Sequence, residues 1–295
     1  MQNSASAEVT VTYEVVHTTR YTYSEAVSVS HHVARVKPRV FAGQACLRHE
    51  LQIEPVPAVM RSHQDYFGNA VTFFIVEGAH KTLTVRAVST VKVGGRSLPV
   101  FVHTPPWEEA CDYDALPLDA IDCLFESASI AVHDTVAGYA HPSFPPGRPL
   151  LEAVADLIHR IHADFTFDPQ ATTVATSLRD VVTMRRGVCQ DFARLGIACL
   201  RSQGLAARYV SGYLETLPPP GEPRLAGVDA SHAWLAIYCP GLGWVDVDPT
   251  NNMFPSTTHV TLAWGRDYVD VSPVRGVILG GGQHSLQVSV DVLRA

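Results

Sequence analysis

The sequence predicts an α+β protein with an antiparallel β-domain at its N-terminal end and a mixed core behind it. Apolar and polar residues alternate in short runs over residues 1–100 and again near the C-terminal end, which is the period of a half-buried antiparallel strand. Between these two regions, apolar residues recur at helical spacing. We therefore expect a helix-bearing core flanked by β-structure.

The N-terminal β-domain is expected over residues 1–100. Alternation begins with the residues Val9, Val11, Tyr13 and Val15. Further β-rich runs follow near residues 27–36, 47–53, 70–76 and 83–93. The pairs Gly68-Asn69 and Gly94-Gly95 are the clearest turn signals between these runs.

A connecting segment is expected over residues 101–149, because repeated prolines leave room only for a short helix near 118–128. A longer helix is then expected from about 150 to 163. Its apolar residues share one face, and they are Leu151, Val154, Leu157, Ile158 and Ile161. A short helix from Ser177 to Met184 would begin with Ser177 as its cap and Asp180 three residues on.

A fourth helix is predicted over residues 189–203. Its apolar residues cover nearly every face, which indicates a helix buried in a core, and Gly204 is the expected C-terminal stop. Cys189 would lie in the first turn, where unpaired backbone N–H groups and the helix dipole favour a thiolate over a thiol. Gly187 just before it allows a tight entry and the close approach of a substrate backbone.

Two strands that bear His232 and Asp248 come after this helix. The runs 229–238 and 243–250 are joined by turn residues, so we interpret them as a β-hairpin. A cysteine on a helix N-terminus, a histidine on a facing strand and an aspartate on the next strand make a thiol triad. Asp246 would share a strand face with Asp248, so periodicity alone leaves the choice of carboxylate open.

These three motifs resemble the transglutaminase-like superfamily, which includes cysteine proteases and has a papain-like arrangement of Cys, His and Asp. The segment from Gly187 to Tyr213 looks like the family's catalytic helix and following strand. The His232-Ala233-Trp234 and Asp248-Pro249-Thr250 motifs look like its histidine and aspartate strands. The resemblance implies that Cys189 is the nucleophile, His232 the general base and acid, and Asp248 rather than Asp246 the orienting carboxylate.

The resemblance covers nearly the whole chain. Asp65-Tyr66-Phe67-Gly68-Asn69 looks like part of the N-terminal β-domain of bacterial transglutaminase-like proteins, and the run 263–268 is similar to the segment after their Asp-Pro-Thr strand. It implies a catalytic core over residues 150–255, in which the catalytic helix packs on an antiparallel sheet. A C-terminal β extension is expected over 256–295, with a last strand that returns to the β-rich N-terminal part.

The proline-rich run 217–223 cannot be a regular central strand, so we expect a surface loop there. Such a loop would lie between the helix and strand that bear the catalytic motifs, and it could border the substrate cleft.

The resemblance implies a cysteine acyl-transfer enzyme that acts on the amide bond of a peptide or protein substrate through a thioester. No cofactor and no metal are expected. Water as acceptor would make it a cysteine protease or amidohydrolase, and an amine would make it a protein-glutamine transglutaminase. Two other classes stay open: a non-enzymatic peptide-binding protein on the same fold, and a zinc site built from Cys189, His232 and Asp248.

Composition agrees with a soluble enzyme of 295 residues, of which 46% are hydrophobic and 17% charged. The chain has 22 Lys and Arg against 29 Asp and Glu, which gives a net charge of −7. The sequence shows no cluster of basic residues of the kind that binds nucleic acid. We find no apolar run long enough to span a bilayer and no secretory leader, so we expect a cytoplasmic protein that does not bind membranes. The six cysteines lack paired spacing, which disfavours both a structural zinc site and a disulfide framework.

Overall fold

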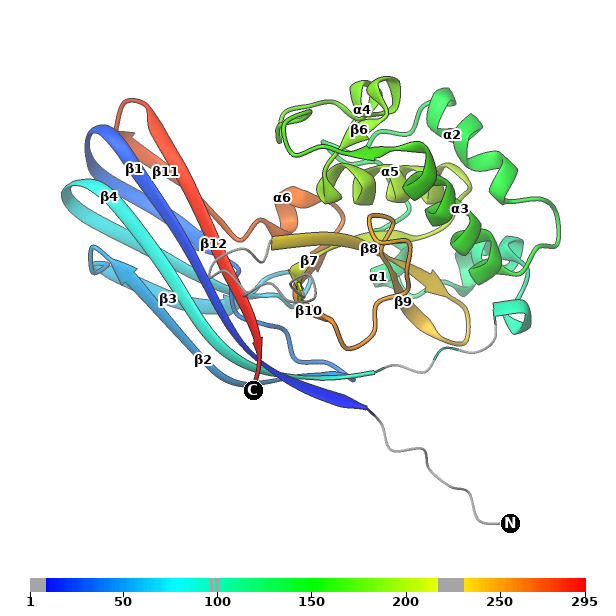
Figure 1. Cartoon of the computed structure of the whole chain (residues 1–295), viewed down its shortest axis with the longest axis horizontal. Coiled ribbons are helices and arrows are strands. Elements are labelled where there is room, and N and C mark those ends of the chain that lie inside the picture. Colours follow the sequence, from blue (N-terminus) through cyan, green and yellow to red (C-terminus); the bar gives the residue numbers. More distant parts are fainter. Residues whose placement is uncertain (1–8, 96–97, 99–100, 217–230) are drawn as a thin grey trace, which may run out of the picture.

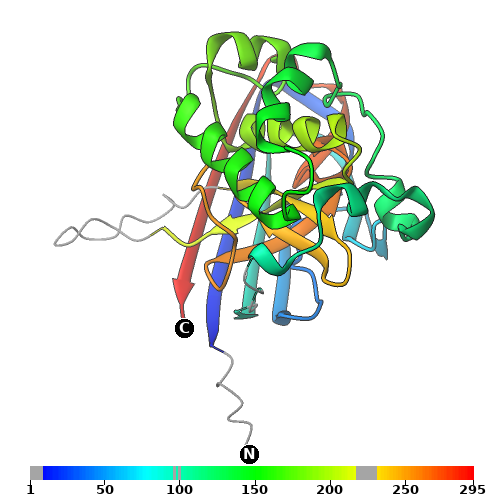
Figure 2. The same cartoon turned by 90° about the vertical axis from the view of Figure 1, so that its right-hand side faces the viewer.

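The computed structural model describes residues 9–95, 98, 101–216 and 231–295. It confirms the predicted α+β fold class. Long antiparallel strands form one side of the molecule, and a smaller sheet with its helices forms the other (Figure 1). Viewed at a right angle, the helices lie in front of the long strands (Figure 2). The surface loop expected at 217–223 falls outside the described residues.

The large sheet is built by both ends of the chain. Its strand order is β11-β1-β4-β2, with β12 also paired to β1 and β3 paired to β4. The strands are β1 (Thr10–Ala34), β2 (Gln44–Glu54), β3 (Val59–Gln64), β4 (Ala70–Gly94), β11 (Val274–Gly280) and β12 (His284–Arg294). All these pairings are antiparallel. The expected return of the last strand to the N-terminal part is therefore confirmed.

Strands β1 and β4 are 25 residues long each, although the sequence predicted separate, shorter strands in both regions. Their pairing shifts register between Thr22 and Val29 of β1, opposite the part of β4 that contains Gly78. Gly78 has a φ of 90°, a conformation that glycine adopts without a side-chain clash. A bulge bends a strand without ending it, so the alternation on its two sides belongs to one strand.

The small sheet forms the core and has the strand order β10-β7-β8-β9. Its strands are β7 (Ala207–Leu214), β8 (Ser231–Cys239), β9 (Gly243–Val247) and β10 (His259–Gly265). The helix predicted over 189–203 is α5 (Cys189–Ser202), and all residues from Asp191 to Arg201 are buried. It packs on the sheet face that bears Leu235. A Cβ at Gly196 would lie 2.5 Å from a Leu235 methyl carbon, so glycine permits the close approach.

Two further helices agree with the sequence. Helix α3 (Leu150–Asp164) buries the predicted apolar face. Helix α4 (Leu178–Met184) is capped by Ser177, whose hydroxyl accepts a hydrogen bond from the backbone N–H of Asp180 at 3.2 Å. Serine at this position satisfies one of the donors that a helix N-terminus leaves unpaired.

The connecting segment contains more turns than the sequence indicated. The helix expected near 118–128 is a single turn, α1 (Leu118–Ile121), and a second helix, α2 (Asp134–Ala140), follows it. The remaining short elements are η1 (Phe101–His103), η2 (Trp107–Cys111), η3 (Tyr113–Ala115), η4 (His141–Ser143), β5 (Thr166–Phe167), β6 (Arg186–Gly187) and α6 (Tyr268–Val271). The proposed division of the chain at residues 100, 149 and 255 stays a prediction.

Two amide side chains hold β10 in place, one on β2 of the large sheet and one in the turn just before β4. Gln44 donates to the carbonyl of Thr261 and accepts from its backbone N–H, both at 2.8 Å. Asn69 makes the same pair of bonds to Trp264, at 2.9 and 3.0 Å. Each side-chain amide bonds to β10 as the backbone of a neighbouring strand would. It thereby satisfies the backbone N–H and the carbonyl of one β10 residue. The large sheet thereby fixes the position of the core sheet.

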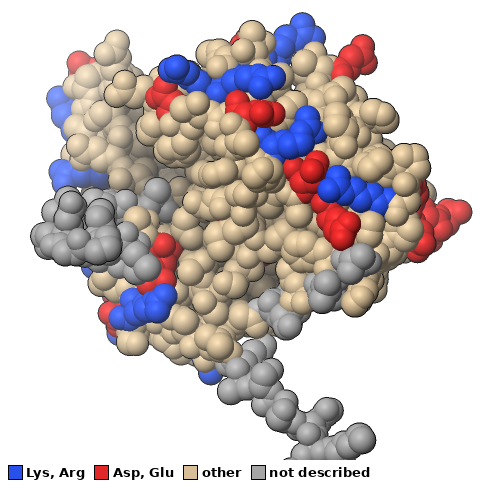
Figure 3. Space-filling view, turned by 45° about the vertical axis from the view of Figure 1, so that its right-hand side comes forward, with Lys and Arg blue, Asp and Glu red and all other residues tan. Residues whose placement is uncertain are grey.

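The two parts also share apolar packing. Tyr13 and Val15 of β1 and Val290 of β12 belong to the same buried cluster as the residues of α3 and α5. On the face shown in Figure 3, basic and acidic side chains lie interspersed, so no extended patch of one sign covers it. Among the described residues, no helix is long and apolar enough to cross a membrane.

Candidate active site

Cys189 is the first residue of α5 and is half-buried. Asp191 accepts a hydrogen bond from the backbone N–H of Val188 at 3.0 Å and another from the Thr172 hydroxyl at 2.6 Å. A Cβ at Gly187 would lie 2.8 Å from the Asp191 carboxylate. Glycine at position 187 therefore leaves the room that the Asp191 side chain occupies. Asp191 in turn fixes the backbone that leads into Cys189, which accounts for the tight entry that the sequence predicted there.

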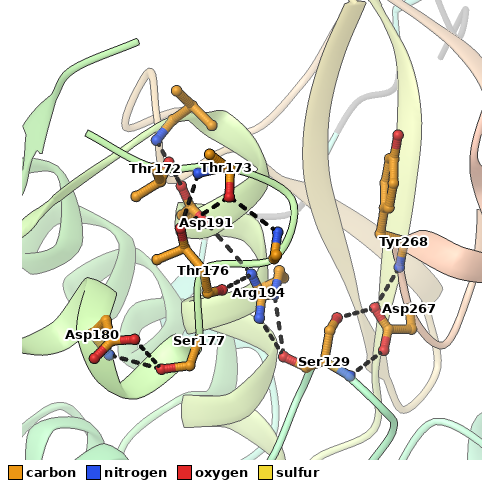
Figure 4. A network of polar contacts seen from close by, with 12 residues as sticks. Ser129, Thr172, Thr173, Thr176, Ser177, Asp180, Asp191, Arg194, Asp267 and Tyr268 are labelled. Carbon is orange, nitrogen blue, oxygen red and sulfur yellow. Dashed lines mark hydrogen bonds and ion pairs between the residues drawn. The ribbon is translucent and has the colours of Figure 1, made fainter. Parts of the chain in front are cut away.

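A polar network extends from this first helical turn (Figure 4). Arg194 forms an ion pair with Asp191 at 3.5 Å and donates to the carbonyl of Ser129 at 2.7 Å. The backbone N–H of Ser129 donates to Asp267 at 2.9 Å, and Asp267 accepts from the backbone N–H of Tyr268 at 2.6 Å. The network therefore fixes Cys189 and Tyr268 relative to each other, at the start of α5 and of α6.

His232 and Asp248 form a buried hydrogen-bonded pair. His232 lies near the start of β8, Asp248 directly follows β9, and Nε2 of His232 is 2.8 Å from Oδ2 of Asp248. Only 7% of His232 and none of Asp248 is exposed. The carboxylate also accepts from the backbone N–H of Thr250 at 2.9 Å and from the Asn251 side chain at 2.7 Å. These bonds compensate for the burial of its charge.

The pair has strongly shifted pKa values. Burial alone would lower the pKa of His232, but hydrogen bonds to Asp248 and Cys189 and their negative charges raise it from 6.5 to about 10. Burial alone would raise the pKa of Asp248, but hydrogen bonds from His232 and His259 hold it well below its usual range. An imidazolium beside a carboxylate is therefore the favoured state of the pair near neutral pH.

His259 is a buried member of this site that sequence reasoning missed. Its Nε2 lies 3.0 Å from Oδ2 of Asp248, and its Nδ1 is 3.0 Å from the Thr258 hydroxyl. Trp234 packs against both histidines, with ring centroids 5.9 Å from His232 and 5.1 Å from His259, and the two histidine rings are 5.8 Å apart. No local motif marks His259, because β10 reaches Asp248 only through the folding of the sheet.

Asp246 lies apart from the pair formed by His232 and Asp248. It is opposite Ala236 in the sheet and lines a second cavity together with Arg208 and Trp244. Periodicity left Asp246 and Asp248 as alternatives, the family resemblance implied Asp248, and the structure brings Asp248 to His232.

Among the described residues, His232, Asp248 and His259 are the group whose atoms lie close enough together to hold a metal ion. Cys189, which the zinc hypothesis requires, is not in this group. Both histidines hydrogen-bond through Nε2 to an ionised carboxylate oxygen, which requires a proton on each nitrogen. Nitrogens that carry these protons cannot also be metal ligands, so the residues do not fit a zinc ion in this arrangement.

A cavity of about 470 Å³ opens above Cys189 and His232. The core contributes part of its wall, including Tyr209 and Ser211 of β7. The large sheet contributes the opposite wall. Such a cavity has the size of a small-molecule or peptide side-chain site. The cavity thus contains a thiol and an imidazole, and the buried carboxylate of Asp248 bonds to the imidazole, which is an arrangement suited to nucleophilic attack on an acyl group.

Comparisons with known proteins identify the family and the fold of the chain. Residues 13–92 match the bacterial transglutaminase-like N-terminal region, and residues 139–249 match the transglutaminase-like superfamily. An uncharacterised protein of Mycobacterium tuberculosis is 41% identical over 289 residues, which cover 95% of this chain and 92% of the relative.

Two further similarities concern proteins with descriptive names. A protein-glutamine gamma-glutamyltransferase of Pseudomonas aeruginosa is 31% identical over 128 residues, which are 37% of this chain and 19% of that protein. The crystal structure of a putative cysteine protease from Cytophaga hutchinsonii has a TM-score of 0.78 at 22% identity, covering 97% of this chain and 91% of that chain. The second similarity shows the fold.

Proposed function

The chain belongs to the transglutaminase-like superfamily, and on that premise we propose that it is a cysteine amidohydrolase that cleaves an amide bond of a peptide or protein substrate. In this proposal Cys189 is the nucleophile, His232 the general base and acid, and Asp248 the orienting carboxylate. The observation that supports it most is one cavity that contains both Cys189 and His232, with Nε2 of His232 occupied by Asp248.

The hydrogen bonds assign a role to each nitrogen of His232. Because Nε2 bonds to Asp248, Nδ1 is the nitrogen left to exchange a proton with Cys189 and with the substrate. The Cys189 sulfur attacks the amide carbon, a C–S bond forms, and the carbonyl electron pair moves onto oxygen. When this intermediate collapses, the C–N bond breaks, and the Nδ1 proton goes to the leaving amine. A thioester on Cys189 results.

Water completes the cycle in the second half. Nδ1 takes a proton from the attacking water, the new C–O bond forms, and the C–S bond breaks to return the thiolate and release a carboxylic acid. Water is the proposed acceptor because none of the described residues that line the cavity is Asp or Glu. A carboxylate would be the simplest means of attracting a lysine ammonium group as acceptor.

Transamidation is the second candidate. The Pseudomonas relative is a protein-glutamine gamma-glutamyltransferase, and its similarity covers 37% of this chain. In that reaction an amine would attack the thioester in place of water, with the same role for His232.

Turnover of activated esters and peptide amides tests the proposal, with and without a dansylated alkylamine as acceptor. Hydrolysis that disappears in Cys189→Ala and persists in Cys46→Ser supports it, since Cys46 is a free, half-buried thiol on β2. Amine incorporation that exceeds hydrolysis selects the transferase. No turnover, together with unchanged peptide binding after iodoacetamide treatment, selects the non-enzymatic binding protein.

A further inference from the structure

The wall of the cavity opposite Cys189 is made by the large sheet. His17, Thr19 and Tyr21 alternate along β1 and so share one face, and Leu286 and Val288 of β12 lie beside them. The register pairs Thr19 with Val288 and Tyr21 with Leu286. The β-domain and the C-terminal strand therefore form one continuous patch that faces the nucleophile.

The described walls of this cavity bear no formal charge away from the catalytic residues. None of the described residues that line it is Asp, Glu, Lys or Arg. Burial lowers the pKa of His17 to about 4, so this histidine is neutral near pH 7. Its two nitrogens bond to the Tyr213 hydroxyl at 2.8 Å and the Thr19 hydroxyl at 2.7 Å. A charged substrate group held against this wall, away from His232, would lose water without gaining an ionic partner from the wall.

We infer that β1 and β12 form the acyl-donor subsite, which accepts an uncharged acyl chain and discriminates against chains that end in a carboxylate or an ammonium group. This inference rests on the proposed function, because it assumes that an acyl group is transferred to Cys189. It makes the β-domain a determinant of substrate choice, and it includes a neutral carboxamide chain among the accepted donors.

Four activated esters separate charge from shape. Pentanoyl and glutaramoyl p-nitrophenyl esters are neutral, the glutaryl ester is an anion of nearly the same shape as glutaramoyl, and the 5-aminopentanoyl ester is a cation. We expect kcat/KM for both neutral esters to exceed that for both charged esters by about 10-fold or more, since an unpaired charge is costly in such a site. Equal values for glutaramoyl and glutaryl esters would overturn the inference.

Charge placed at Val288 should invert the preference. Val288 is 50% exposed, so a polar side chain is tolerated there. Val288→Asp should raise the ratio of aminopentanoyl to glutaryl turnover about 10-fold, and Val288→Lys should lower it as much. Leu286 lies on the same strand and is 52% exposed, so Leu286→Asp should act like Val288→Asp. It replaces Val288→Asp in the experiment if that variant folds poorly.

Val277 provides the matched control. It is a 76% exposed valine on β11 of the same sheet and is not part of the cavity. Val277→Asp should leave the ratio unchanged, and a shift as large as that of Val288→Asp would contradict a local subsite. A wild-type protein that hydrolyses none of the esters and forms no adduct on Cys189 would refute the proposed function itself, which is a different result from equal turnover of all four.

A second inference concerns Tyr209, on a separate observation. Tyr209 lies on β7, is 1% exposed, and lines the cavity. Its hydroxyl makes no hydrogen bond to any described residue, whereas the equally buried Tyr213 is bonded to His17. Tyr209 is close enough to Cys189 for their charges to interact, and burial followed by this charge raises the pKa of Tyr209 well above its usual value. The phenol therefore keeps its proton and is an available donor in the cavity that also contains Cys189.

We propose that the Tyr209 hydroxyl donates a hydrogen bond to the oxyanion of the tetrahedral intermediate, together with the backbone N–H of Cys189. Removal of one such donor lowers kcat by about 10²- to 10³-fold in other acyl-transfer enzymes. This second inference also assumes acyl transfer by Cys189.

The Tyr209→Phe variant tests this role by comparing two reactions of the same thiol. Ester hydrolysis should fall about 10²-fold or more, and a peptide aldehyde, whose adduct with the thiol bears this oxyanion, should bind correspondingly more weakly. Alkylation by iodoacetamide forms no oxyanion and should change less than about 2-fold. Tyr238→Phe, which removes a phenol hydroxyl of β8 outside the cavity, should leave hydrolysis nearly unchanged. Unchanged hydrolysis in Tyr209→Phe, or alkylation that falls in parallel, would overturn the assignment.

Discussion

Replacement of Asp248 by asparagine should remove the charge that keeps His232 protonated. In the folded protein the pKa of His232 is raised from 6.5 to about 10, with both Asp248 and Cys189 contributing. A shift of this size corresponds to about 5 kcal/mol of preference for the imidazolium, shared between the two partners. Measuring the effect in a Cys189→Ala background removes the contribution of the thiolate and isolates that of Asp248.

The sign of the pH dependence is set by the direction of each shift. The raised pKa of His232 contributes stability that is fully present below pH 6.5 and is lost as pH rises toward 10. At acid pH the same ion pair is lost when Asp248 is protonated. Because the pKa of Asp248 is depressed in the folded protein, the pair contributes its full stability above pH 3.8 and loses it as pH falls and the carboxylate is protonated. The destabilisation by Asp248→Asn should therefore be largest between about pH 4 and 6.5 and should decrease on both sides.

Two measurements check this prediction. Urea unfolding of Cys189→Ala and Cys189→Ala/Asp248→Asn, at several values from pH 4 to 10, gives the difference in unfolding free energy. NMR titration of the His232 ring gives its pKa, which should fall by about 2 units or more when the carboxylate is lost. Asp246→Asn is the matched control and should leave the His232 titration unchanged. A pH-independent difference, or a His232 pKa that does not move, would refute the reasoning.

The remaining predictions concern the packing and the neighbours of the pair. A Cβ at Gly212 would lie 2.1 Å from a backbone oxygen of β10, so Gly212→Ala should cost about 3 kcal/mol or more of unfolding free energy. At Gly196 a new Cβ meets only the flexible end of a side chain, so Gly196→Ala should cost less than about 1.5 kcal/mol. Thermal unfolding that ranks the two variants in the opposite order would contradict this account of the packing. Gln44→Leu leaves the backbone N–H of Thr261 unpaired, while the Thr261 carbonyl keeps the bond from the backbone N–H of Arg39, so the change should cost about 1 to 3 kcal/mol by urea unfolding, whereas a neutral effect would mean that β10 is held by other contacts. His259→Leu removes one donor to Asp248 and leaves more of the carboxylate charge to His232, so it should raise the NMR-measured pKa of His232, and it should lower kcat because Asp248 loses a bond that positions it; an unchanged pKa would show that His259 does not bond to Asp248 in solution.

Much of the core was predictable because its signals are local. The helix over 189–203 agrees with α5 because apolar residues fill all its faces and Gly204, with a φ of 79°, ends it. The cap at Ser177 and the apolar face of α3 rest equally on residues close together in sequence. Such features depend on one segment and not on the partner that it packs against.

The features that the sequence did not reveal depend on distant contacts. His259 lies on β10 and bonds to Asp248. Gln44 lies on the large sheet and hydrogen-bonds to Thr261 of the same strand. Gly212 leaves the space in β7 into which Trp234 packs. The sequence did not predict the length of β1 and β4, because a bulge interrupts the alternation in the same way as the end of a strand. Only the pairing with the neighbouring strand shows that each strand continues past the bulge.

The cavity wall is the most important case of this kind. Thr19 and Val288 are 269 positions apart yet are paired in one sheet above Cys189. Alternation predicted both strands, but nothing in the alternation states which sheet face meets the core. The substrate-binding role proposed for this wall therefore required the three-dimensional arrangement.

The most direct test of the central claim is peptide mass spectrometry of the protein, quenched in acid soon after mixing with p-nitrophenyl pentanoate. We predict a pentanoyl adduct on the peptide that contains Cys189, released by neutral hydroxylamine as expected for a thioester, and absent from Cys189→Ala. The adduct should form much more slowly in His232→Ala, because the thiol then lacks its base. Product release with the adduct on another cysteine, or with no thioester at all, would contradict the assignment of Cys189 as the nucleophile.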